Sequence, residues 1–177
     1  MKSLVLVAAL GLVGLSACVS SGSSSTATAN LPTLSVAFAG NEWNGEKIPD
    51  GQQCSYFGGR GSTPPLTVSG VPESTTEIVV EYNDESYPDL SYDGGHGKVG
   101  FRATVGTTQI PAIPGETNAL PDGARIVASH RATGSLARPG YLPPCSGGNG
   151  NRYSADVKAV DSAGTVLATG EITLGLY

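Results

Sequence analysis

Short stretches in which apolar and polar residues alternate recur along this chain, and they constrain its fold more than any other feature. A period of two places the apolar side chains on one face of an extended segment, as in a half-buried β-strand. The segments with this pattern are 34–39, 77–82, 99–105, 153–159 and 172–176. No stretch sustains the three-to-four-residue apolar period of an amphipathic helix, so any helix should be short. Strands that follow one another without intervening helices predict an all-β domain, an antiparallel β-sandwich.

The composition agrees with an exported β domain that has many turns. Glycine (25) and proline (12) are abundant, and charged residues make up only 14% of the chain, against roughly 25% in average proteins. Residues 161–164 read Asp-Ser-Ala-Gly and predict the turn between the last two strands. The net charge is −5 and there is no basic stripe. Nucleic acid is therefore not expected as a partner, because nothing in the sequence would neutralise its phosphates.

The N-terminus predicts export and a lipid anchor. Lys2 precedes the apolar run 4–15, which is too short to span a bilayer as a mature helix. The run ends in Leu15-Ser16-Ala17-Cys18, which resembles a bacterial lipobox. We therefore expect a lipoprotein signal peptide over 1–17, with acyl chains such as palmitate on Cys18. The alternative is an ordinary secretory signal followed by a chance cysteine.

A flexible tether is expected between the lipid and one folded domain. Residues 19–29 are almost wholly Ser, Thr, Gly, Ala and Val, which cannot bury enough apolar surface to order a chain. The predicted organisation is a tether over 18–31 and one β domain over 32–177. Several acyl chains suffice for stable membrane anchoring. Because Val19 stands where inner-membrane retention would require aspartate, we expect an envelope lipoprotein of the bacterial outer membrane that faces the periplasm.

The cysteines predict a disulfide. If Cys18 carries the lipid, Cys54 and Cys145 remain as a pair in an oxidising compartment. Two separate buried thiols are the alternative. The chain has no C-x-x-C spacing and its two histidines are isolated, so neither a metal site nor a cofactor is expected.

Two stretches resemble landmarks of a known family. Residues 63–72 read T-P-P-L-T-V-S-G-V-P, and residues 141–153 read Y-L-P-P-C-S-G-G-N-G-N-R-Y. They are similar to the S-P-P-L-x-W-x-G-V-P and Y-x-G-P-C-P-P-x-G-x-H-R-Y patterns of the phosphatidylethanolamine-binding protein (PEBP) family, in its bacterial Raf kinase inhibitor-like branch. The resemblance implies a large antiparallel sheet packed with smaller ones and a few short helices. The chain departs from the pattern at Ser146 and Gly147, which replace prolines, and at Asn151, which replaces histidine.

The resemblance also implies a pocket for an anionic group at one end of the sheet. Matched to the family's motifs, the ligand-binding residues would be Asp84, Glu85, His96, Pro144, Asn151 and Tyr153. Arg152 would be a buried structural anchor that pairs with a carboxylate of the 83–88 turn. Asn151 cannot carry a charge, so anion binding should be weaker than in the family. Alternatively, Asp84 and Glu85 form a solvated turn and His96 only orders the start of its strand. His130 is expected to be exposed.

The sequence carries no G-x-S-x-G elbow, H-E-x-x-H pair, P-loop or dinucleotide fingerprint, so we do not expect an enzyme. The leading hypothesis is an envelope lipoprotein whose PEBP-like domain binds a small anionic or polar ligand. The alternative is a non-catalytic protein–protein interaction or structural lipoprotein with a degenerate pocket. The expected partners are therefore the ligand and the membrane through the lipid, and, under the alternative, a protein.

Overall fold

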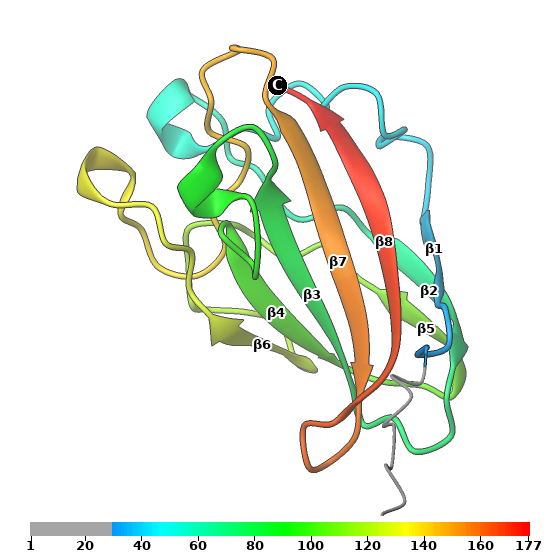
Figure 1. Ribbon diagram of the computed structural model, residues 1–177. Coiled ribbons are helices and arrows are strands. Elements are labelled where there is room, and N and C mark those ends of the chain that lie inside the picture. Colours follow the sequence, from blue (N-terminus) through cyan, green and yellow to red (C-terminus); the bar gives the residue numbers. More distant parts are fainter. Residues whose placement is uncertain (1–29) are drawn as a thin grey trace, which may run out of the picture.

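Two antiparallel sheets pack against each other in the part of the chain that this computed structural model describes, residues 30–177 (Figure 1). The smaller sheet has the strand order β1-β2-β5 and the larger sheet the order β6-β4-β3-β7-β8. The strands are β1 (Ser35–Phe38), β2 (Leu66–Val71), β3 (Glu77–Asp84), β4 (Gly97–Arg102), β5 (Gly106–Ile110), β6 (Ala124–Ala128), β7 (Arg152–Val160) and β8 (Val166–Leu176). Three single-turn 3-10 helices interrupt the loops: η1 (Ser55–Phe57), η2 (Pro88–Leu90) and η3 (Gly134–Leu136). The predicted all-β sandwich with few short helices is confirmed.

The core lies between the sheets and follows the predicted alternation. On β3, the buried side chains of Ile78, Val80 and Tyr82 join one apolar cluster with Leu66 and Val68 of β2. Strand pairing keeps this register, because β3 lies between β4 and β7 with every residue from Glu77 to Tyr82 paired on both sides. Both faces of such a central strand are shielded from solvent, one by the core and the other by side chains of the neighbouring strands. This shielding explains the dense apolar run at the middle of β3.

The observed strands differ from the predicted segments mainly at their ends. The segment predicted over 99–105 ends at Arg102, and the exposed Val105 belongs to the connection into β5. The last strand begins at Val166, six residues before the predicted segment. The predicted 161–164 turn joins β7 to β8, where Asp161 Oδ1 accepts hydrogen bonds from the backbone N–H groups of Ala163 and Thr165, both at 2.8 Å.

One end of the larger sheet gathers segments that are distant in the sequence. The end of β3, the starts of β4 and β7 and the end of β8 lie at this end, with η1, η2 and the 145–150 loop around them (Figure 1). Antiparallel pairing causes this gathering, because Tyr82 near the end of β3 pairs with Gly97 at the start of β4. The candidate site described below lies here.

A disulfide between Cys54 and Cys145 ties the η1 segment to the loop before β7, as predicted. The two Cα atoms are 5.3 Å apart and the residues are 91 positions apart in the sequence. The backbone reinforces this connection, since the N–H of Cys54 donates to the Pro144 carbonyl at 3.0 Å. The predicted signal peptide and Cys18 lie outside the described residues. Within residues 30–177, no helix is long and apolar enough to cross a membrane.

Candidate functional site

A pocket of about 410 Å³ opens at the gathered end of the larger sheet. Its polar lining includes residues from three segments that the family resemblance placed together: Asp84, His96, and Ser146 with Asn151. Leu90, Leu136 and Leu142 supply apolar wall, and Tyr87, Asp89, Arg131, Thr133 and Asn149 complete its polar part. We call this cavity the Asp84–His96 pocket. The remaining sequence-predicted residues, Glu85, Pro144, Arg152 and Tyr153, do not line it.

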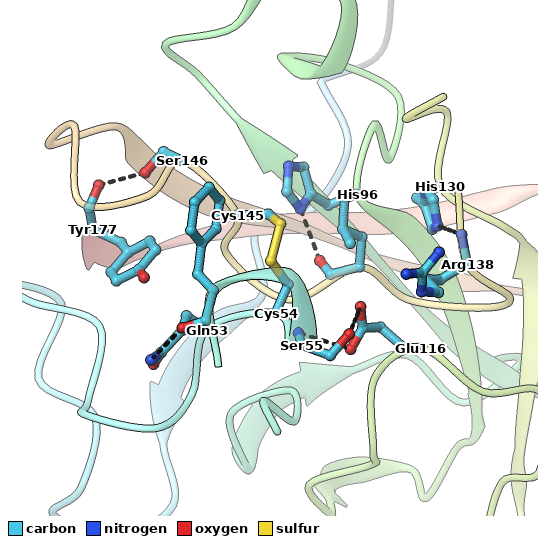
Figure 2. Close-up of a disulfide and its surroundings, with 12 residues drawn as sticks. Gln53, Cys54, Ser55, His96, Glu116, His130, Arg138, Cys145, Ser146 and Tyr177 are labelled. Atoms are coloured by element: carbon cyan, nitrogen blue, oxygen red, sulfur yellow. Dashed lines mark hydrogen bonds between the residues drawn. A yellow bond between two sulfur atoms is a disulfide. The ribbon is translucent and has the colours of Figure 1, made fainter. Parts of the chain in front are cut away.

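His96 precedes β4 and is fixed on three sides. Its backbone N–H donates to the Tyr82 carbonyl and its carbonyl accepts from the Leu142 N–H, both at 2.8 Å. Its ring Nδ1 lies 2.7 Å from the Leu142 carbonyl oxygen (Figure 2). The ring also meets the edge of the Tyr153 ring, with centroids 5.3 Å apart. Only 2% of His96 is exposed.

Burial determines the protonation state of His96. Loss of solvation lowers the pKa of this imidazole to about 4, and the hydrogen bond to Leu142 and the nearby Asp84 charge offset only part of the effect. At neutral pH the ring is therefore neutral. A carbonyl oxygen can only accept, so Nδ1 carries the hydrogen and Nε2 carries the lone pair. The imidazolium that would attract an anion is not present at neutral pH.

Asp84 ends β3 and is buried, so the solvated-turn alternative is wrong for this residue. Its Oδ1 accepts from the Ser86 N–H at 3.0 Å. Its Oδ2 accepts from Asn151 Nδ2 at 2.7 Å. Asn151 is itself held by backbone pairing with Tyr177, which bonds both its N–H and its carbonyl. Asn151, which replaces the family histidine, thus orients the buried carboxylate of Asp84.

Pro144 and Tyr153 are buried and hold the loop that lines the pocket, with the Pro144 carbonyl accepting from the Cys54 N–H. The Tyr153 hydroxyl accepts from the Cys145 N–H at 3.1 Å, and burial raises the pKa of this phenol. Ser146, the next residue, donates its hydroxyl hydrogen to the Tyr177 carbonyl at 2.6 Å (Figure 2). The loop that replaces the family's prolines is therefore held by the disulfide, a phenol and the C-terminal residue.

Glu85 and Arg152 lie outside the Asp84–His96 pocket. Glu85 lines a neighbouring depression with Asn83, Asp156 and other polar residues. Arg152 turns toward the acidic turn, with Nε 3.9 Å from Glu85 Oε2, but both side chains are about half exposed. The expectation of a buried Arg152 anchor is wrong, because Arg152 begins β7 on the face opposite the buried Tyr153.

The 130–138 segment contributes a wall that sequence reasoning missed. The Arg131 guanidinium donates to the carbonyls of Asp89, Tyr92 and Asp93 and lies 4.8 Å from the centre of the Tyr92 ring. His130 is buried rather than exposed, and backbone N–H groups of the following loop lie 3.2 Å from each of its ring nitrogens. Burial lowers its pKa. No periodicity or motif marks this segment in the sequence.

The described residues contain no group of three or more His, Cys, Asp or Glu side chains that could hold a metal ion. Four residues of these types line the pocket: Asp84, Asp89, His96 and Cys145. Asp89 is exposed and Cys145 is disulfide-bonded, so only Asp84 and His96 are buried groups with free ligand atoms. Two separate groups do not provide the ligand number that a structural zinc site requires. The chemistry that the pocket offers is hydrogen bonding and charge.

Comparison with known proteins identifies the fold. No protein-family model and no curated protein matches this chain. Among solved structures, it is similar to YbcL of Escherichia coli, described as a new member of the mammalian PEBP family, with 26% identity, a TM-score of 0.52 and coverage of 81% of this chain and 97% of that one. A PEBP homologue from Chlamydia trachomatis, CT736, matches with 22% identity, a TM-score of 0.49 and coverage of 82% and 97%. The chain is thus a divergent PEBP-like protein, and its two antiparallel sheets are those of that fold.

Proposed function

We propose that this chain is an envelope lipoprotein whose PEBP-like domain binds a small polar ligand in the Asp84–His96 pocket, without catalysis. The observation that carries the proposal is the convergence of Asp84 at the end of β3, His96 before β4, and Ser146 and Asn151 of the loop before β7 on one cavity. Their positions are held by short hydrogen bonds to Leu142, Tyr177 and one another. A preformed cavity with few oriented polar groups is typical of small-ligand sites.

The size and lining of the pocket support a small ligand. A volume of about 410 Å³ lies near the lower end of the range for ligand pockets. Three leucines supply apolar contact, and each lies in the same segment as polar residues of the lining. The test is native mass spectrometry of the full chain purified under mild conditions. A co-purified small molecule that is lost in a His96→Phe variant supports the proposal, and a ligand-free spectrum together with no NMR response to any small polar compound would overturn it.

Membrane anchoring is the second part of the proposal and has a separate test. Its support is the lipobox-like stretch ending in Cys18, in a part of the chain outside the described residues. Cys18→Ser should release the full chain from the membrane fraction or leave it unprocessed, because no other cysteine precedes the folded domain. Cys18→Ser protein that is processed and partitions with membranes as the wild type does would refute lipidation as the anchor.

An interaction role is the second candidate, favoured by exposed aromatic residues at the same end of the molecule. Tyr56 and Phe57 of η1 are 55% and 40% exposed, and Tyr87 and Tyr92 are 52% and 62% exposed. Aromatic side chains are enriched at the centres of protein interfaces. A Tyr56→Ser/Phe57→Ser variant that loses a partner in cross-linking from cells, while keeping the small ligand, would favour this role.

A further inference from the structure

The polar groups of the Asp84–His96 pocket present hydrogen-bond acceptors to it. His96 uses its Nδ1 hydrogen on the Leu142 carbonyl at 2.7 Å, which leaves the Nε2 lone pair without a partner in residues 30–177. The Nδ2 group of Asn151 donates to Asp84, so the Oδ1 atom of Asn151 remains as an acceptor. Ser146 gives its hydroxyl hydrogen to the Tyr177 carbonyl and keeps only lone pairs. Each side chain is oriented by a partner that leaves its acceptor free.

Asp84 adds a buried negative charge that no cationic side chain compensates. The residue is 4% exposed, and its carboxylate accepts hydrogen bonds from neutral donors, the Ser86 N–H and the Asn151 amide. Within residues 30–177, no Lys, Arg or His nitrogen lies within 4.0 Å of its carboxylate. Buried charges in proteins are normally paired, because desolvation strongly disfavours a lone ion.

Another buried carboxylate on the same strand shows the usual arrangement. Glu81 of β3 is 5% exposed, and its Oε1 lies 3.2 Å from Lys98 Nζ and 2.8 Å from Lys158 Nζ. The one arginine that lines the pocket does not serve Asp84 in this way, because the Arg131 guanidinium donates to three backbone carbonyls. Asp84 therefore lacks the cation that Glu81 has.

Donors are few on this side of the pocket. Asn149 Nδ2 already donates to the Ser146 carbonyl at 2.6 Å. The hydroxyls of Tyr87 and Thr133 lie in the lining and can donate or accept. The exposed carboxylate of Asp89 adds a second negative charge to the lining, which the Arg131 charge offsets. The balance of charge and of oriented groups thus disfavours an anion and suits a donor.

We propose that the ligand is a small primary amine in its protonated form, bound with its ammonium group against Asp84 and its short carbon chain against the leucines. An ammonium group has three hydrogens, which match the Asp84 carboxylate, His96 Nε2 and one of the Asn151 or Ser146 oxygens. The apolar remainder meets Leu90, Leu136 and Leu142. This inference rests on the proposed function and specifies the ligand class of the same pocket.

Three probes of nearly equal size test the charge preference: n-propylamine, 1-propanol and propionate. Each is titrated into the full chain at pH 7 while NMR follows the ring signals of His96 and the side-chain amide of Asn151. We expect n-propylamine to shift both sets of signals in a saturable way, and to bind at least about tenfold more tightly than propanol, because a charge-assisted hydrogen bond is roughly twice as strong as a neutral one. Propionate should cause no saturable shift.

Two variants and a control locate the effect. Asp84→Asn keeps the size of the side chain but removes the negative charge and one of the two oxygens that accept from Ser86 and Asn151. It should weaken n-propylamine by about tenfold or more. Asp122→Asn, at an exposed turn near the opposite end of the sheet, is the matched control and should change nothing. Asn151→His places an imidazole beside Asp84, supplies the missing cation within the protein and should also weaken the amine.

The outcomes separate this inference from the proposed function. Saturable binding of propionate but not of n-propylamine would overturn the amine assignment and leave a ligand pocket. Equal amine binding by the wild type and Asp84→Asn, with both folded by circular dichroism, would also overturn it. No saturable response to any of the three probes in a folded protein would overturn the inference and count against the proposed function as well.

Discussion

His96 should make the stability of this protein depend on pH in a window that its burial defines. Burial lowers the pKa of folded His96 to about 4, whereas an unfolded imidazole has a pKa of about 6.5. Between these values the unfolded state binds a proton that the folded state does not, so stability falls as the pH falls. The contribution is fully present above about pH 6.5 and lost by about pH 4. A gap of about 2.5 pH units corresponds to about 3 kcal/mol.

The pKa of about 4 already includes the effects of the groups around the His96 ring. The Leu142 carbonyl and the Asp84 carboxylate each raise the pKa of His96, while the nearby His130 lowers it. Burial outweighs them because the ring lies between the 142–145 loop and the Tyr153 ring, with 2% of the residue exposed. Protonation would also turn Nε2 from an acceptor into a donor and remove one contact proposed for the ligand.

Urea unfolding of the wild type and of His96→Gln at pH 7, 6, 5 and 4 measures this effect. Glutamine is neutral throughout, and the packing that it loses against Tyr153 is a constant offset. Other titrating groups largely cancel in the difference between the two proteins. The variant should therefore gain about 3 kcal/mol relative to the wild type between pH 7 and pH 4. Parallel stability curves, or an NMR-measured pKa of His96 above 6 in the folded protein, would refute the reasoning.

Three further predictions concern the frame around the pocket. The double variant Cys54→Ala/Cys145→Ala, whose native disulfide spans 91 residues, should lose about 4–5 kcal/mol in urea unfolding; a loss below about 1 kcal/mol would contradict this. Gly95→Ala would place a Cβ 2.1 Å from the backbone oxygen of Leu90 and should cost about 1–3 kcal/mol, which an unchanged melting temperature would exclude. Glu81→Gln removes a carboxylate shared by two lysines and should cost about 1–3 kcal/mol, with a neutral result in chemical denaturation as the contrary outcome.

The fold was predictable because local patterns determine it. Alternation identified β1, β3, β4, β7 and β8, since burying one face of a strand leaves a period of two in the sequence. Three strands were missed: β2, β5 and β6. The 63–72 stretch that contains β2 was singled out as a family landmark and not as a strand. The outer strands β5 and β6 are short and only weakly patterned, and β5 reads Gly-Thr-Thr-Gln-Ile. The end of β4 was placed three residues too late, because Val105 continues the alternation in sequence while Gly106, with φ of 78°, already begins β5.

The site was predictable only as far as residue types and family order extend. They placed Asp84, His96, Ser146 and Asn151 around one cavity, but not the 130–138 wall. They also suggested a pocket of donors for an anion, whereas the role we propose for these side chains is that of acceptors. Whether a histidine or an amide presents a donor or an acceptor is decided by its partner. Here each partner is distant in sequence: Leu142 lies 46 positions from His96, Asp84 lies 67 from Asn151, and Tyr177 lies 31 from Ser146. Only the folded chain brings these pairs together, so the polarity of the pocket is a property of the tertiary structure.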